Sequence, residues 1–234
     1  MNWLNKLERK IGRYAVPNLI IWLIGAYTIG YVFGTVSPGI LSYLTLSPYH
    51  ILHGQIWRLV TWVFMPTESN LIFLLIMALF YYQLGMALER TWGTFRFNVY
   101  IFGGILLTVV GSLLMYGVIY LIFGQASAYM ASSLMGGIIS TTYINMSIFL
   151  AFAAMYPDMQ VMLYFIIPIK MKWMAWVYGA IIVYNMISYV RVGLWVMAVP
   201  ILASLLNFVL FFFSNRNMHR YNPKEVHRRR EFKK

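Results

Sequence analysis

Cysteine is absent from this sequence of 234 residues, and charged residues make up only 10% of it. Without cysteine, the chain has no disulfide framework, no thiol nucleophile and no thiolate metal site. A soluble domain of this size carries far more charge than this. The hydrophobic share of 61% therefore predicts a polytopic integral membrane protein.

Six apolar runs are each long enough for the roughly 20 residues that a membrane-crossing helix needs. They lie at about 15–35, 69–88, 97–123, 137–156, 173–190 and 192–214. We expect an all-α membrane protein with a six-transmembrane-helix bundle over residues 15–214. An interfacial amphipathic helix precedes it at 1–14, and a basic cytoplasmic tail follows at 215–234.

Three of the segments that connect these runs are informative. The first loop, 36–68, is long and contains Pro38, Pro48 and Pro66, so we expect it to be partly embedded in the membrane. Residues 125–136 are uncharged and small, which indicates a link. The apolar stretch 161–169 is too short to span, which indicates a re-entrant or surface-lying segment.

Basic residues are distributed unevenly among the connections. If the N-terminus is inside, all 18 lysines and arginines except Arg58 and Arg191 fall in inner segments. The positive-inside rule then predicts a multi-pass protein with both termini cytoplasmic, in the cell membrane if the organism is bacterial. The basic tail is expected to attract anionic lipids. Nucleic-acid binding would need aromatic platforms or a folded module, and neither is visible.

None of the six runs, as bounded above, contains Asp, Glu, Lys, Arg or His. Coupled transporters and proton pumps place ionisable groups at mid-membrane, where the driving ion is bound and released. Their absence argues against a coupled transporter. A small-solute facilitator lined by hydroxyls and amides remains open.

Several short motifs occur in a fixed order along the chain. Trp57-Arg58 with Thr61 precedes the second run. A Gly-x-x-Leu-Glu-x-x-x-Gly pattern, made by Gly85, Glu89 and Gly93, covers the end of that run and the residues just after it. The fifth run is entered through a Pro-Ile-x-x-Lys-Trp sequence that begins at Pro168. This ordered set on six runs resembles the rhomboid superfamily.

That resemblance implies a compact helical bundle beside a large, half-submerged first loop. Arg58 would tie the loop together through contacts to carbonyls, although an arginine that snorkels to the interface is the alternative. Glu89 would brace the inner end of the second helix against Arg90, Arg96 or backbone amides. Active rhomboids also carry a serine in a Gly-x-Ser-Gly pattern on the fourth helix, a histidine on the sixth, and a histidine and an asparagine on the second.

This sequence departs from the catalytic pattern. The nucleophile position falls near Thr142, with Ser147 deeper in the same run, and neither has the flanking glycines. The second-run positions become approximately Phe73 and Met77. The four histidines, none of them in the sixth run, are His50, His53, His219 and His227. Because a serine hydroxyl without an adjacent base is a poor nucleophile, we expect no catalytic residue, with Ser147 and Thr142 as fallback candidates.

The sequence is thus similar to the inactive rhomboid relatives, among them the Derlins. The resemblance implies a protein that binds transmembrane segments of client proteins and perturbs the bilayer locally, without cofactor or metal. A degenerate but active intramembrane serine protease and a small-solute facilitator are the alternatives. Hydroxyl and amide groups on the fourth run are the candidates to line a client groove: Ser140, Thr141, Thr142, Asn145 and Ser147.

Overall fold

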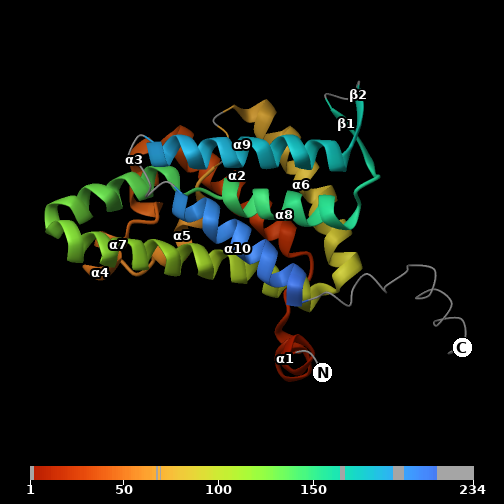
Figure 1. Cartoon of the computed structure of the whole chain (residues 1–234), viewed down its shortest axis with the longest axis horizontal. Coiled ribbons are helices and arrows are strands. Elements are labelled where there is room, and N and C mark those ends of the chain that lie inside the picture. The colour runs from red at the N-terminus through yellow and green to blue at the C-terminus, as the bar shows by residue number, and fades with distance from the viewer. Residues whose placement is uncertain (1–2, 67, 69, 164–166, 192–197, 215–234) are drawn as a thin grey trace, which may run out of the picture.

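A computed structural model describes residues 3–66, 68, 70–163, 167–191 and 198–214, and most of these are helical (Figure 1). The principal helices are α1 (Trp3–Ile11), α2 (Leu19–Val36), α6 (Leu71–Trp92), α7 (Thr94–Ile138), α8 (Thr142–Met155), α9 (Met171–Arg191) and α10 (Ala198–Ser214). The first loop contains α3 (Pro38–Leu44), α4 (Pro48–Leu52), α5 (Arg58–Thr61) and the 3-10 turn η2 (Trp62–Phe64). Prolines begin α3 and α4, where a missing N–H costs nothing.

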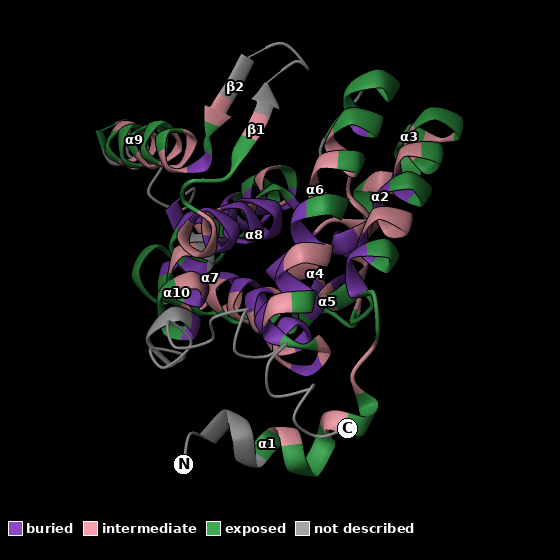
Figure 2. Cartoon of the chain, turned by 90° about the vertical axis from the view of Figure 1, so that its right-hand side faces the viewer, coloured by how far each residue is buried: buried purple, intermediate pink, exposed green. Residues whose placement is uncertain are grey.

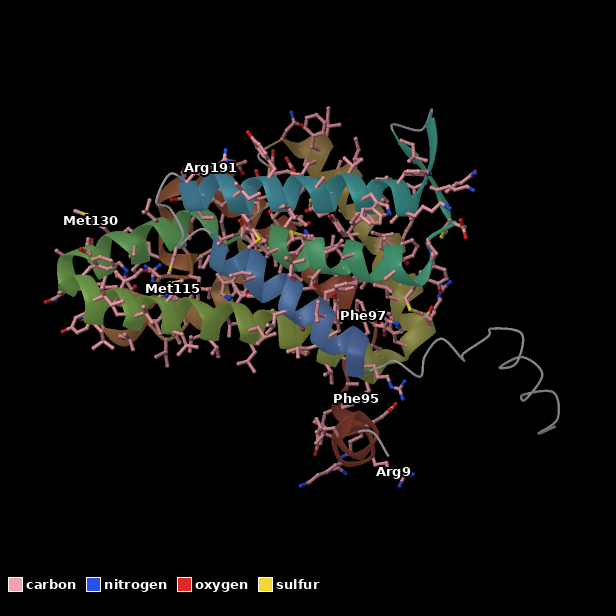
Figure 3. All side chains as sticks on the ribbon, viewed as in Figure 1. Arg9, Phe95, Phe97, Met115, Met130 and Arg191 are labelled. Atoms are coloured by element: carbon pink, nitrogen blue, oxygen red, sulfur yellow. The ribbon has the colours of Figure 1, made fainter. Side chains whose placement is uncertain are left out.

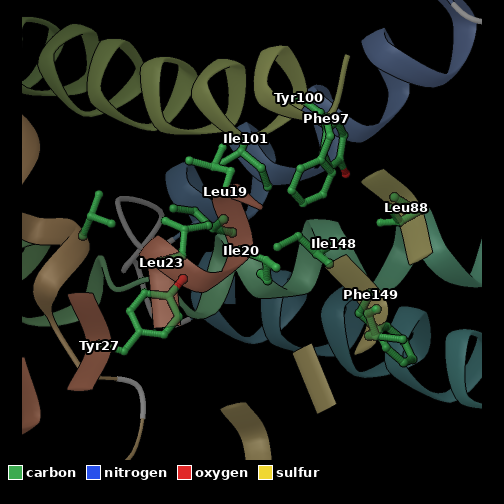
Figure 4. Packing of buried hydrophobic residues seen from close by; sticks show 14 of the residues in the cluster. Leu19, Ile20, Leu23, Tyr27, Leu88, Phe97, Tyr100, Ile101, Ile148 and Phe149 are labelled. Atoms are coloured by element: carbon green, nitrogen blue, oxygen red, sulfur yellow. The ribbon is translucent and has the colours of Figure 1, made fainter. Parts of the chain in front are cut away.

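Helix α8 is the centre of the bundle. It packs against α6, α7, α9 and α10, and most of its residues are buried (Figure 2). The main core joins Ile20 and Leu88 to Phe97 and Ile148, which come from four different helices (Figure 4). Helix α8 carries apolar residues on all of its faces, as expected of a helix that is enclosed by other helices.

Three of the described helices, α2, α6 and α7, are long and apolar enough to cross a membrane, and α8 and part of α10 are shorter apolar helices. The outer faces of the bundle expose large apolar side chains, such as Leu114, Leu121 and Trp176. A water-soluble protein does not expose so much apolar surface, so these faces are suited to lipid. The chain is a helical, multi-pass integral membrane protein.

Helix α7 reverses direction at Gly124, whose φ of 82° is rarely adopted by residues with a side chain. Residues 125–138 then form a second helical segment that returns along the first (Figure 1). Ala128 and Ala131 of the returning segment pack against Tyr116 and Ile119. The link expected at 125–136 is therefore helical, and its small residues allow the two helical segments to pack closely.

The described residues of the stretch 161–169, for which we expected a re-entrant or surface-lying segment, are β-strands. Strands β1 (Gln160–Leu163) and β2 (Ile167–Lys170) form an antiparallel hairpin in which Gln160 pairs with Lys170. Its base is closed by Met171 N–H donating to the carbonyl of Met159 at 2.9 Å. No Asn-Gly or similar turn signal occurs between the strands, which is why the sequence did not predict a hairpin.

Helix α1 lies apart from the bundle and runs across the direction of α8 and α9 (Figures 1 and 2). Arg9 lies on the side of α1 away from the bundle (Figure 3). Glu8 of this helix forms an ion pair with Arg96 at 3.5 Å. The chain leading to α2 is clamped by Asn98, whose side-chain amide exchanges two hydrogen bonds with the backbone of Val16 at 2.9 and 2.8 Å. These contacts hold α1 beside the bundle end that carries Arg96.

Candidate functional site

An apolar groove lies between α6 and α9, with α8 as its floor. Its volume is about 560 Å³. The lining residues are aromatic or aliphatic and uncharged: Phe80, Tyr81, Phe149, Ile169, Trp173, Met174, Val177, Tyr178 and Ile181. Both walls continue into exposed apolar surface on α6 and α9, so the groove opens sideways into the region occupied by lipid.

The local sequence explains why α9 presents one continuous wall. Trp173, Val177 and Ile181 are spaced by four residues, so they lie along one face of the helix. Ring contacts hold the floor in place. The ring centroid of Phe149 lies 5.3 Å from that of Tyr178, in an edge-to-face arrangement, and 6.4 Å from that of Phe80. The groove is thus preformed by packed aromatic rings.

A smaller, more polar pocket of about 280 Å³ adjoins the groove and shares Tyr178 and Ile181 with it. It lies at the start of α8, between α8, α9 and the beginning of α10. Its remaining lining residues are Ile138, Ser140, Thr142, Tyr143, Met146, Ile182, Asn185, Tyr189 and Ile201. This described lining has hydroxyls and one amide, and it includes no imidazole, amine or carboxylate.

Of the five predicted groove residues, the structure brings only Ser140 and Thr142 to the polar pocket. Thr141 is buried and donates to the carbonyl of Met65 at 3.1 Å. Asn145 is also buried, and its side-chain oxygen accepts a hydrogen bond from Tyr27 at 3.3 Å.

Ser147 lies in the closed core, away from both cavities' linings. Its hydroxyl donates to the Tyr100 hydroxyl at 2.8 Å, and Tyr100 donates to the Ser147 carbonyl at 2.7 Å. Trp92 and Phe211 pack around the Tyr100 ring. A phenol is a weak base at neutral pH, so this pair cannot activate a serine as an imidazole would.

The two histidines in the described part of the chain, His50 and His53, line neither the groove nor the polar pocket. His50 Nδ1 lies 2.8 Å from Ser47 Oγ, which is 2.8 Å from the buried Ser132 Oγ of the returning segment of α7. Ser132 Oγ also accepts a hydrogen bond from the backbone N–H of Tyr49 at 2.9 Å. His53 bonds the Tyr49 carbonyl through Nδ1 at 2.7 Å. The imidazoles of His50, in α4, and of His53, at its C-terminal end, therefore lie in the part of the first loop that docks on α7.

Acid is expected to weaken this docking. Burial, together with the nearby charges of Arg58 and His53, lowers the pKa of His50 below its ordinary value of 6.5. The docked loop thus binds the proton less tightly than the unfolded loop does. The contribution of His50 to the stability of the docked loop is fully present above pH 6.5, and it is lost as the pH falls from 6.5 toward the lowered pKa. Hydrogen exchange of the α4 amides, corrected for intrinsic rate, should be faster at about pH 5 than at about pH 7.5. His50→Gln should remove this difference, whereas equal protection of the native protein at both pH values would contradict it.

The Trp57-Arg58 motif closes the first loop on itself. Arg58 is only 4% exposed and donates to the carbonyls of Ser42 at 2.8 Å and Thr45 at 3.0 Å, and to the side chain of Gln55 at 2.7 Å. Burial lowers the pKa of its guanidinium. These are carbonyl contacts of the kind expected from the sequence, and the buried position differs from that of a snorkelling arginine.

The two flanking motif residues add further bonds to α3. Trp57 donates its indole N–H to the carbonyl of Tyr43 at 3.2 Å. Thr61 donates its hydroxyl to the carbonyl of Leu44 at 3.2 Å. The motif is thus a set of side chains that satisfy carbonyls where the loop turns between α3 and α5.

The second motif packs and terminates α6. Gly85 lies against Ile20, whose side chain would be only 2.6 Å from a Cβ at that position. Glu89 is buried and accepts a hydrogen bond from the backbone N–H of Asn18 at 3.0 Å, one of the amide partners expected. Gly93 ends the helix with a φ of 86°. Because α6 continues to Trp92, Glu89 and its neighbour Arg90 lie inside the helix rather than beyond its end.

Sequence reasoning missed Tyr178, which lies where the groove meets the polar pocket, and Asn185, which lines the polar pocket alone. Tyr178 lines both cavities, and Asn185 supplies the only amide of the polar pocket's described lining. The signal available was Asn185 itself, an amide within an apolar run, since polar residues in spans are costly and are often functional. Among the described residues, no group of three or more His, Asp or Glu is close enough to hold a metal ion.

The fold and site together define a helical integral membrane protein with a laterally open apolar groove. A family model described as "Eukaryotic integral membrane protein (DUF1751)" matches residues 18–219, and the chain belongs to this family. No curated protein and no solved structure matches the chain. The family description names no activity, ligand or particular membrane, and the rhomboid resemblance stays a prediction.

Proposed function

We propose that this is a rhomboid-like, six-crossing membrane protein that binds transmembrane segments of other proteins without cleaving them. The observation that carries the proposal is the apolar groove between α6 and α9. Its lining is uncharged and consists of aromatic and other apolar side chains, and it opens sideways between helices whose outer faces are also apolar. An occupant must therefore arrive from within the membrane.

A helix suits this groove because the spacing of its wall residues repeats every four positions. Trp173, Val177 and Ile181 form a ridge along α9 into which the side chains of a neighbouring helix can interdigitate. Both helices of the opening, α6 and α9, contact the central α8. An added helix would complete the layer that α6 and α9 leave open over Phe149.

Short helices support the proposed effect on the bilayer. Helix α8 has 14 residues and α2 has 18. At 1.5 Å per residue they rise about 21 and 27 Å, against a hydrocarbon thickness of about 30 Å. Because α8 is enclosed by other helices, we propose that the short α2, whose Trp22 and Val32 are exposed, thins the lipid beside it. The proposed orientation places both termini on the cytoplasmic side. The basic tail, proposed to contact anionic lipids, lies outside the described residues.

Proteolysis and solute passage are supported less well. The Ser147 hydroxyl is engaged by Tyr100, and the Thr142 hydroxyl lies in a pocket whose described lining has no base. The buried hydroxyls of Thr108 and Ser112 bond carbonyls of their own helix, so they do not form the polar lining that a solute path needs.

We therefore expect a fluorophosphonate serine-hydrolase probe to leave the purified protein unlabelled. The matched sample is Ser147→Ala. It should give the same background signal, because the native hydroxyl donates to Tyr100 and is hydrogen-bonded to no imidazole, amine or carboxylate among the described residues. Labelling of the native protein that disappears in Ser147→Ala would establish the protease alternative.

Client binding can be tested by cross-linking, because the native chain has no cysteine. Val177→Cys places one thiol on the groove wall, and Leu114→Cys places one on the lipid-facing side of α7, where the native residues are 62% and 66% exposed. The probe is a synthetic Leu/Ala-rich transmembrane helix with one cysteine, reconstituted with each variant and oxidised. We expect several-fold more disulfide at position 177. Equal yields at both positions would refute binding in the groove.

A further inference from the structure

The polar pocket contains hydrogen-bonding groups that the protein leaves available. Within the described part of the chain, the side-chain amide of Asn185 makes no hydrogen bond, and neither do the hydroxyls of Tyr143, Tyr178 and Tyr189. The Thr142 hydroxyl accepts a bond from Ser140 at 2.9 Å, which leaves its own proton free to donate. In an apolar environment such groups cost free energy until they are paired.

The pocket and the groove form one continuous surface. Tyr178 and Ile181 line both, so a helix lying against the α9 ridge passes the mouth of the polar pocket. The pocket lies where α8 begins, at the end of the bundle opposite to the β1–β2 hairpin (Figure 1). A side chain from one third of a bound helix can therefore reach Thr142 and Asn185.

The chemistry of the lining selects an uncharged partner. The side-chain amide of Asn185 can both donate and accept hydrogen bonds. The Thr142 hydroxyl can donate one, and the tyrosine hydroxyls can donate or accept. The described lining contains no charged group, so an ionised side chain would lose its hydration without gaining a counter-ion. An amide or hydroxyl side chain can donate and accept here, and the volume of about 280 Å³ accommodates it.

We infer that the polar pocket is a specificity site for transmembrane segments that carry an uncharged amide or hydroxyl side chain (Asn, Gln, Ser or Thr) in the third of the helix that lies where α8 begins. This inference rests on the proposed function, because the helix must first occupy the groove. The pocket then distinguishes such helices from wholly apolar ones and from helices with an ionised residue at the same depth. Interhelical hydrogen bonds in membranes provide enough free energy for this selection.

The experiment uses the Val177→Cys protein and four synthetic Leu/Ala-rich transmembrane helices. They are wholly apolar, or carry one Asn in the pocket-side third, one Asn in the opposite third, or one Lys in the pocket-side third. We expect the pocket-side Asn to raise the cross-linking yield about threefold to tenfold over the apolar helix. The opposite-third Asn and the Lys should give no such increase. Thr142→Val with Asn185→Leu should abolish the increase and leave the yield of the apolar helix unchanged.

Thr28→Val is the matched control, because Thr28 is an exposed helical threonine whose hydroxyl bonds its own helix at Ile24. It should retain the full preference, and a retained melting temperature shows that each variant is folded. If the apolar helix cross-links but the Asn makes no difference, or if its effect survives Thr142→Val with Asn185→Leu, this inference is overturned and groove binding stands. If no helix cross-links above the Leu114→Cys level, the proposed function itself fails.

Discussion

Replacing Arg58 by alanine is expected to lower the melting temperature of the protein in detergent by several degrees. The guanidinium is 4% exposed and pairs with two carbonyls, those of Ser42 and Thr45, and with the side chain of Gln55. Removing it leaves the Thr45 carbonyl and the Gln55 side-chain oxygen without the donor that they have in the native protein, whereas the Ser42 carbonyl keeps a bond from the Thr45 hydroxyl at 3.0 Å. Each buried, unpaired acceptor costs about 1–3 kcal/mol, so we expect a loss of about 2–5 kcal/mol.

Two variants separate this role from a general effect of charge. Arg90→Ala removes an exposed arginine and should leave the melting temperature nearly unchanged. Arg58→Lys keeps the charge but lacks the planar guanidinium that reaches several acceptors at once. Its melting temperature should therefore lie between those of the native protein and Arg58→Ala. A melting temperature for Arg58→Ala equal to that of the native protein would show that the loop does not depend on this residue.

The second large effect is expected at Gly30, where α2 crosses the end of the first loop. A Cβ at this position would overlap the backbone carbonyl oxygen of Phe64 and lie 2.7 Å from its carbonyl carbon. Backbone atoms cannot move aside as a flexible side chain does. Gly30→Ala must therefore push α2 away from the loop, and we expect it to cost at least about 3 kcal/mol, the upper end of ordinary overpacking.

Gly25 on the same helix is the matched control. Nothing lies within 4 Å of a Cβ built there, so Gly25→Ala should be neutral or stabilise the helix by about 0.5–1 kcal/mol. Opposite shifts of the melting temperature for the two alanine variants are the expected result. If both substitutions shift it alike, close contact between α2 and η2 is not present in the folded protein.

These predictions show which parts of the structure could be read from the sequence. Arg58 could be anticipated because a guanidinium among Trp, Ile, Leu and Val must find acceptors nearby, and the only abundant ones are backbone carbonyls. Gly30 could not, because Gly25 and Gly34 occur on the same apolar helix and only the packing partner distinguishes them. The contact with Phe64 joins residues 34 positions apart, and no local pattern marks it.

The candidate groove residues show the same division. The hydroxyls and the amide near the start of α8 were identified as a group, but they lie on different faces of the helix and of the two residues before it. Ser140 and Thr142 line the polar pocket, whereas Thr141, Asn145 and Ser147 bond to the loop, α2 and α7 respectively. Because the run is apolar on all sides, its periodicity does not indicate which face is turned to the groove.

The sequence alone determined the class of this protein: an almost uncharged chain with long apolar runs is a helical membrane protein, since hydropathy and helix length are local properties. It also determined that no cysteine chemistry takes place. Only the tertiary structure decided that α7 turns back at Gly124, that residues 160–170 pair as strands, that Glu89 serves the start of α2, and that Tyr178 joins two cavities. Each of these depends on which helix lies beside which, and such contacts between distant segments leave no repeating signal along the chain.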